Sequence, residues 1–182
     1  MEKNVYLDLG YWVQKKAKQL GASQSALGIN QSRSVSVDYR DGKVETLKES
    51  TQQSLWIELF AGGRYSSHST NDLRKDSLEK FLTNAVDLTG FLTKDEFRRL
   101  ADPELYKGQS KVDLDLNDSS QGDITAEERK ARAKALGAQL EGKDERIISV
   151  ASGFYDSHSE AYQLASNGFE GHKESTSFTH WV

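Results

Sequence analysis

Residues 34–45 read SVSVDYRDGKVE, and this stretch decides the fold class. Apolar residues alternate with polar ones through it and on its N-terminal side, as in a strand with one buried face. The alternating set is Leu27, Ile29, Val35, Val37 and Tyr39. Asp41-Gly42 is a dipeptide typical of a two-residue hairpin turn. The stretch therefore predicts a long strand, a tight turn and a strand that returns over about residues 43–51.

Two further strands follow along the chain. Residues 55–60, LWIELF, are apolar at odd and even positions, as expected for a central strand covered on both faces. Gly62-Gly63 supplies the next turn, and residues 65–70 form a polar strand nearer the edge of the sheet. These segments predict a meander of antiparallel strands.

Two amphipathic helices are predicted from their spacing. In residues 4–20, Val5, Leu9 and Trp12 fall on one face of a helix with a period of 3.6. Residues 77–90 repeat the pattern. Asp76 or Ser77 is suited to cap the start of this second helix.

A third helix is predicted from a capping box. Thr125 and Glu128 have the required spacing, so a helix should begin there and extend to about residue 141. Its apolar stripe is narrow and consists of Ile124, Ala131, Ala135 and Ala138. The mixed charges of residues 127–130, EERK, indicate a solvated face.

The rest of the chain consists of a connector and a hairpin region. Residues 93–123 are a long polar connector, in which residues 112–116 alternate like a short strand or an extended strap. Ile148, Val150 and Phe154 alternate, as do Tyr162 and Leu164. Asn167-Gly168 predicts another hairpin turn, and residues 169–182 predict the last strand.

The order of these elements predicts the fold class. Strands and helices are segregated along the chain instead of alternating as in βαβ units. We expect an α+β fold in which an antiparallel β-sheet, a meander plus C-terminal hairpins, packs with about three α-helices. This fold should occupy residues 1–182 as one domain.

Composition excludes several function classes. The 182 residues contain 24 Lys+Arg and 28 Asp+Glu, a net charge of −4, and the pI of 5.6 argues against direct nucleic-acid binding. Mean hydropathy is −0.71, and no apolar run approaches the roughly 18 residues of a membrane span. The start, MEKN, has no apolar signal-peptide core, so we expect a cytoplasmic location and no membrane partner. The absence of cysteine excludes disulfides and thiolate chemistry.

Candidate catalytic groups are few. Ser66 and His68 share a strand face with Asp72 near in sequence, but a solvated hairpin arm explains them better than a triad does. Asp156 and His158 would share a face of an extended strand, and a surface or turn hydrogen bond explains them better than a base dyad does. The sequence contains no His-Glu-x-x-His segment, so no catalytic residue and no metal ligand is assigned.

The tryptophans suggest packing more than ligand binding. Trp12 and Trp56 lie inside core patterns. Trp181 stands beside the last residue of the sequence, where a large apolar side chain is unusual unless something covers it.

Several motifs, in order, resemble the TldD/PmbA family, the modulators of DNA gyrase, and its PmbA (TldE) arm more than its TldD arm. Residues 34–45 resemble the first hairpin of the family. Residues 64–73, RYSSHSTNDL, are similar to its serine-rich arm, which ends in Thr-Asp-Leu before a helix. Residues 100–105, LADPEL, with 113–116, DLDL, resemble its strap, and residues 165–169, ASNGF, its Asn-Ser-x-Gly hairpin.

The resemblance implies a function that no pattern above supplies. TldD and PmbA/TldE proteins together form a bacterial zinc metalloprotease that acts on peptides or unfolded segments. Members are longer, with a mostly β C-terminal domain that this chain lacks, and the zinc motif belongs to the TldD arm. The resemblance therefore implies the N-terminal domain of a non-catalytic subunit, with zinc only in the catalytic partner. The link to gyrase would run through a toxin or peptide antibiotic and not through DNA contacts.

These expectations define a candidate site and its alternatives. The partners would be a TldD-like subunit, or a second copy through self-association, and a peptide or unfolded-protein substrate. The candidate contact edge is the polar strand that carries Arg64, Ser66, His68 and Thr70, because an exposed strand edge can bind an extended peptide. A stand-alone binding or structural module without proteolysis is the alternative. An autonomous hydrolase that uses His68 or His158 is the third hypothesis.

Overall fold

The computed structural model describes residues 5–110 and 112–182. The first residue of the helix predicted over 4–20 lies outside the described residues. The helices are α1 (Val5–Gln19), α2 (Lys75–Thr89) and α3 (Ala126–Gly137), with short 3₁₀ helices η1 (Pro103–Tyr106) and η2 (Ser119–Asp123). The strands are β1 (Gln24–Arg40), β2 (Lys43–Ala61), β3 (Arg64–Thr70), β4 (Ala151–Ala165) and β5 (Glu170–Trp181).

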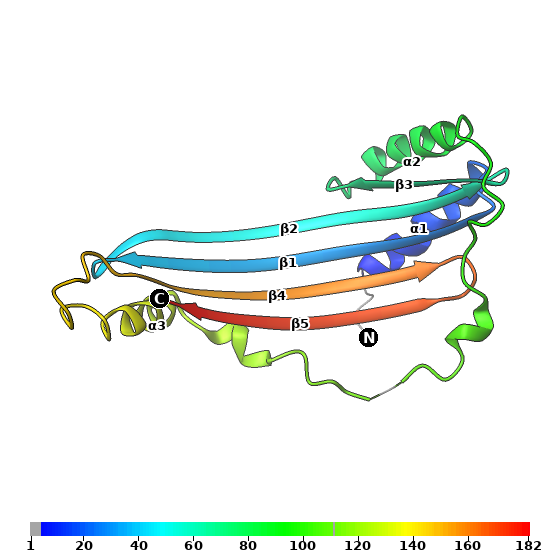
Figure 1. Ribbon diagram of the computed structural model, residues 1–182. Helices are drawn as coiled ribbons and strands as arrows, with labels where there is room; N and C mark the ends of the chain where they lie inside the picture. Colours follow the sequence, from blue (N-terminus) through cyan, green and yellow to red (C-terminus); the bar gives the residue numbers. More distant parts are fainter. Residues whose placement is uncertain (1–4, 111) are drawn as a thin grey trace. The chain divides into compact units, whose positions relative to one another are not determined.

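The strands form one sheet in the order β3-β2-β1-β4-β5, and neighbouring strands run in opposite directions (Figure 1). This confirms the predicted α+β fold with an antiparallel sheet and three α-helices. The polar strand β3 lies at one end of the strand order, as its composition predicts.

Both predicted hairpin turns at the start of the sheet are present. Asp41 and Gly42 have φ values of 48° and 73°, and Gly62 and Gly63 have φ values of 57° and 74°. Positive φ at both central residues is what the tight hairpin turn requires, and aspartate and glycine adopt it at the least cost.

The strand boundaries differ from the prediction in two places. Residues 43–51 and 55–60 are not separate strands, because β2 runs unbroken from Lys43 to Ala61. The polar residues 52–54 between the two predicted strands are also part of β2, because main-chain hydrogen bonds to a neighbouring strand do not depend on side-chain polarity. Ile148 was expected in a strand, but it lies before β4 and its side chain is 96% exposed.

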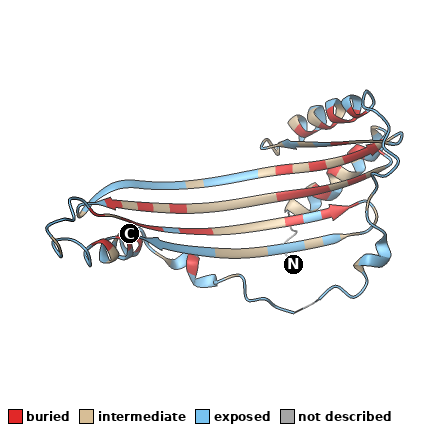
Figure 2. Ribbon diagram, viewed as in Figure 1, coloured by how far each residue is buried: buried red, intermediate tan, exposed pale blue. Residues whose placement is uncertain are grey.

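The described residues divide into two compact units, each with its own core. Unit 1 comprises residues 5–31, 53–110 with 112, and 160–173, and its core lies under α1 and α2. Its largest fully buried side chains include Leu27, Ile29, Leu55, Ile57, Leu59, Leu78 and Leu82. Figure 2 shows these buried segments in red on β1, β2 and α2.

Unit 2 comprises residues 32–52, 113–159 and 174–182. Its apolar core is smaller and consists of Val37, Tyr39, Ala133 and Phe154. The predicted stripe of α3 is wrong: Ala131, Ala135 and Ala138 are exposed, and the buried positions are Arg129, Ala133 and Gly137. A buried arginine begins this stripe, so the stripe cannot be recognised from apolar residues.

The helix starts show one confirmed and one wrong cap. At α3 both bonds of the Thr125–Glu128 capping box are present. At α2 the N-cap is Arg74, whose side chain makes no cap bond, and Asp76 and Ser77 lie inside the helix. None of the helices in the described part of the chain is long and apolar enough to cross a membrane.

Candidate functional site

Strand β3 directs two of its four predicted contact residues, Ser66 and His68, toward α2. The Ser66 Oγ lies 2.5 Å from the Thr89 Oγ1 and 2.9 Å from the His68 Nε2. The His68 ring meets the Phe81 ring edge-on, with 6.3 Å between centroids. Burial lowers the pKa of His68 below its usual value. These side chains join β3 to α2, so what β3 can offer a peptide is its main-chain edge, and that role stays a prediction.

The other two residues of the arm contact local main chain. The Arg64 Nε donates to the Leu92 carbonyl at 2.8 Å, and the Thr70 Oγ1 accepts from the Asp72 N–H at 3.1 Å. Hydrogen bonds, first of all from the Arg74 guanidinium, hold the pKa of Asp72 well below its usual range. The Asp72 carboxylate therefore accepts hydrogen bonds from Arg74, and a Ser66–His68–Asp72 triad is not formed.

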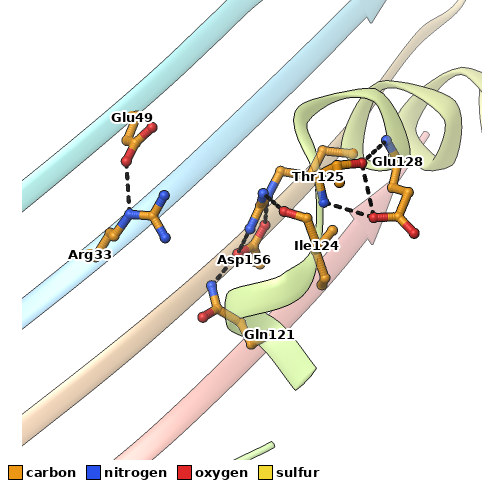
Figure 3. Close-up of polar contacts among 8 residues, drawn as sticks. Arg33, Glu49, Gln121, Ile124, Thr125, Glu128 and Asp156 are labelled. Atoms are coloured by element: carbon orange, nitrogen blue, oxygen red, sulfur yellow. Dashed lines mark hydrogen bonds and ion pairs between the residues drawn. The ribbon is translucent and has the colours of Figure 1, made fainter. Parts of the chain in front are cut away.

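Asp156 and His158 are not a catalytic dyad. Asp156 is fully buried and receives two bonds from the Arg129 guanidinium, Nε at 2.5 Å and Nη2 at 2.9 Å, and one from the Gln121 side chain (Figure 3). His158 instead pairs with Glu174 at 2.7 Å. The prediction of a surface or turn contact for Asp156 is wrong, and so is the solvated face proposed for Arg129, which is 4% exposed.

The described residues do not fit a zinc site. No group of three or more His, Asp or Glu side chains within residues 5–110 and 112–182 is placed to hold a metal ion. Three histidines have oxygen partners close by: Ser66 for His68, Glu174 for His158 and Glu160 for His172.

The feature that the sequence did not reveal is a cavity in unit 1 of about 330 Å³. Its lining includes Leu27, Trp56, Glu58, Arg99, Tyr106 and Phe169. The cavity is mostly apolar with one acidic and one basic side chain, which is the usual character of a ligand pocket.

One wall of the cavity joins two segments that are far apart in the sequence. The Asn167 Nδ2 donates to the Ala101 carbonyl at 2.7 Å and to the Tyr106 hydroxyl at 2.9 Å. The Tyr106 and Phe169 rings lie 4.9 Å apart. The hairpin turn after β4 thus holds the connector around η1 in place.

Trp56 lies against the neighbouring strand of the sheet. A Cβ on Gly28 would come within 2.3 Å of the Trp56 Nε1, so the indole lies against a position that only glycine can occupy. Trp56 is only partly buried, which corrects its prediction as a simple core residue. Trp181 lies on Gly153 of β4 in the same manner and stays 42% exposed.

The acidic side of the cavity is also fixed. The Tyr65 hydroxyl donates to the Glu58 Oε1 at 2.8 Å, and the Arg98 guanidinium stacks 4.6 Å from the centre of the Tyr65 ring. Burial, and then the bond to Glu58, raises the pKa of Tyr65.

Comparison with known proteins shows which family the chain resembles. Residues 26–89 match the family model described as PmbA/TldA metallopeptidase domain 1. Metalloprotease PmbA of Escherichia coli O157:H7 is 28% identical over 140 residues, which are 76% of this chain and 30% of that protein. A Bacteroides thetaiotaomicron protein named as a candidate modulator of DNA gyrase is 37% identical and has a TM-score of 0.93 over 99% of this chain and 41% of that one. The chain thus matches the first domain of PmbA/TldA metallopeptidases over residues 26–89 and is similar to a candidate modulator of DNA gyrase over nearly its whole length.

Two more distant PmbA/TldD structures support the fold alone. A candidate gyrase modulator from Thermotoga maritima is 12% identical with a TM-score of 0.77, and covers 97% of this chain and 39% of that one. TldE from Thermococcus kodakarensis is 10% identical with a TM-score of 0.72, and covers 92% and 37%. The chain thus spans between 30% and 41% of the length of these relatives.

Two of the sequence motifs that carry the resemblance contact each other in the structure. The strap motif at residues 100–105 and the hairpin motif at residues 165–169 meet at the cavity through the Asn167 bonds. Each motif could be recognised in the sequence, but their contact could not. The bonded residues Asn167 and Tyr106 are 61 positions apart in the chain.

Proposed function

We propose that this chain is the N-terminal domain of a PmbA/TldE-type, non-catalytic subunit of a zinc metallopeptidase. The complex would contain a TldD-like subunit, or a second copy, and would process peptides and unfolded proteins in the cytoplasm. In this role the domain helps to assemble the subunits and forms part of the substrate chamber. Support comes from the match of residues 26–89 to the first domain of PmbA/TldA metallopeptidases.

The cavity in unit 1 is the observation that carries this proposal. An unfolded segment differs from a folded protein in that its apolar side chains are available to bind elsewhere. Trp56, Tyr106 and Phe169 give the cavity an aromatic lining that can hold one such side chain. Glu58 and Arg99 offer one charge of each sign to the polar groups of a peptide backbone beside it.

Trp56 makes the proposal testable by fluorescence. The variant Trp12→Phe/Trp181→Phe leaves Trp56 as the one tryptophan of the chain, since the sequence contains three. We expect extended peptides with a central phenylalanine to change the Trp56 emission saturably. Peptides with serine in its place should not, because they have no apolar group to bury.

A matched pair of tyrosine variants localises the binding. Tyr106→Ser removes part of the cavity lining and should abolish the fluorescence response. Tyr155→Ser changes an exposed tyrosine of β4 outside the cavity and should leave it intact. An equal response to the phenylalanine and serine peptides, or one that survives Tyr106→Ser, would contradict binding in the cavity.

A further inference from the structure

The first half of β2 has an unpaired edge. In the strand order β2 lies between β3 and β1, but its pairing with β3 extends only from Leu55↔Thr70 to Ala61↔Arg64. Along residues 43–54, β2 therefore has β1 on one side and no strand of the described chain on the other. Such an edge presents a row of main-chain N–H and C=O groups that can pair with an added strand.

This edge is exposed on both faces as well. Residues 43–49 and 51–53 are all exposed, and Figure 2 shows this half of β2 in pale blue. Even its apolar side chains are open, with Val44 47% and Leu47 52% exposed. The neighbouring strand β1 buries Val35 and Val37 in unit 2.

Proline does not protect this edge. Residues 43–54 read KVETLKESTQQS and contain neither proline nor glycine, so every residue keeps its N–H donor. Charged side chains, which natural proteins also place on edge strands, are the protection that remains.

The charges of this edge are not balanced. The Arg40 Nε bonds Glu45 at 3.0 Å, and the Arg33 Nε bonds Glu49 at 2.7 Å, the pair drawn in Figure 3. β1 thereby neutralises both acidic side chains of the edge. Lys43 and Lys48 have no ion pair within the described residues. The edge therefore presents a net positive charge to a partner.

We propose that residues 43–52 of β2 bind an extended, acidic segment of a partner protein as an added strand. Main-chain hydrogen bonds hold the segment, and Lys43 and Lys48 select for its carboxylates. The lysines are 48 − 43 = 5 positions apart and therefore lie on opposite faces of the strand. The segment that fits carries acidic residues five positions apart.

Charge reversal tests the selection. The probe is a labelled, soluble peptide of β-branched residues with two glutamates five positions apart, and its binding to the chain is followed by fluorescence anisotropy at low salt. Lys43→Glu/Lys48→Glu should weaken binding about tenfold, since each exposed ion pair is replaced by a repulsion. Lys15→Glu/Lys80→Glu, exposed lysines of α1 and α2, gives the same net charge and should bind like the parent chain. A peptide with lysines in place of the glutamates should bind only the reversed variant.

Proline substitution tests the main-chain part. Adjacent residues of a strand point their N–H groups to opposite edges, so Thr46→Pro and Leu47→Pro remove one donor from the free edge and one from the β1 side. The variant whose Tm stays close to that of the parent has lost the free-edge donor, and this variant should fail to bind the acidic peptide.

Three outcomes would overturn the proposal. The first is an equal loss of peptide affinity in the two double lysine variants. The second is unchanged peptide binding by the proline variant that keeps its Tm. The third is a chain that does not bind the peptide but self-associates, and that dissociates on Lys48→Glu. The last outcome would assign the edge to a second copy. The edge shares no residue with the cavity of unit 1, so the Trp56 response reports on the cavity separately from this edge.

Discussion

At the level of single residues, the Arg129–Asp156 pair is the main polar contact of unit 2. Asp156 is fully buried and Arg129 nearly so, and the guanidinium also donates to the Ile124 carbonyl (Figure 3). The pair fixes the start of α3 to β4. A buried charge that loses its partner is costly, while removal of both charges together costs far less.

Asp156→Asn should therefore destabilise the chain by about 3 kcal/mol, because it leaves the Arg129 charge buried and unpaired. The double variant Arg129→Met/Asp156→Leu removes both charges and should recover most of this loss. Urea unfolding of the three chains measures the difference. A double variant as unstable as Asp156→Asn would argue against an electrostatic role for the pair.

The position of Trp56 depends on one glycine. Gly28→Ala places a Cβ 2.3 Å from the indole, so we expect a loss of about 1–3 kcal/mol in stability and a shifted Trp56 emission. Gly122→Ala is the matched control, since a Cβ there meets nothing within 4 Å. Thermal unfolding of both variants checks the prediction, and equal Tm values would contradict the close packing of Trp56 on β1.

Among the elements, β3 and α2 are joined through His68, whose pKa burial lowers. Below about pH 6.5 the His68 imidazole of the unfolded chain is protonated, whereas that of the folded chain is protonated only at a lower pH. The contribution of the neutral His68 is therefore present above that pH and is lost as the pH falls. Urea unfolding from pH 8 to pH 5 measures the free energy of unfolding of the parent and of His68→Gln. The difference in favour of the parent should become smaller as the pH falls. A constant difference across this range would contradict a lowered pKa for the partly buried His68.

Local patterns predicted the elements well and their contacts poorly. The hairpin dipeptides Asp41-Gly42 and Asn167-Gly168 and the capping box at Thr125 are chemical signals that act within a few residues, and each formed as expected. Arg129 looked solvated, because its buried partner Asp156 is distant in sequence (|i−j| = 27). The cavity was missed for the same reason, since its wall depends on the contact of Asn167 with Tyr106.

For the molecule as a whole, the two units have different characters. Unit 1 has the larger apolar core and the aromatic cavity. Unit 2 has a small apolar core, a buried ion pair and the open edge of β2. Each unit thus has a feature that we propose for binding extended chains, and no group of His, Asp or Glu side chains in the described residues is placed to hold a metal ion.

The central proposal is that this chain is part of a non-catalytic subunit that binds substrate and helps to assemble the complex. The most direct test is the zinc content and casein hydrolysis of the purified chain, alone and mixed with a TldD-type subunit. Our account predicts that the chain alone contains no stoichiometric zinc and leaves casein intact, and that both zinc and hydrolysis appear with the TldD-type subunit. Stoichiometric zinc and casein hydrolysis in the chain alone would contradict it.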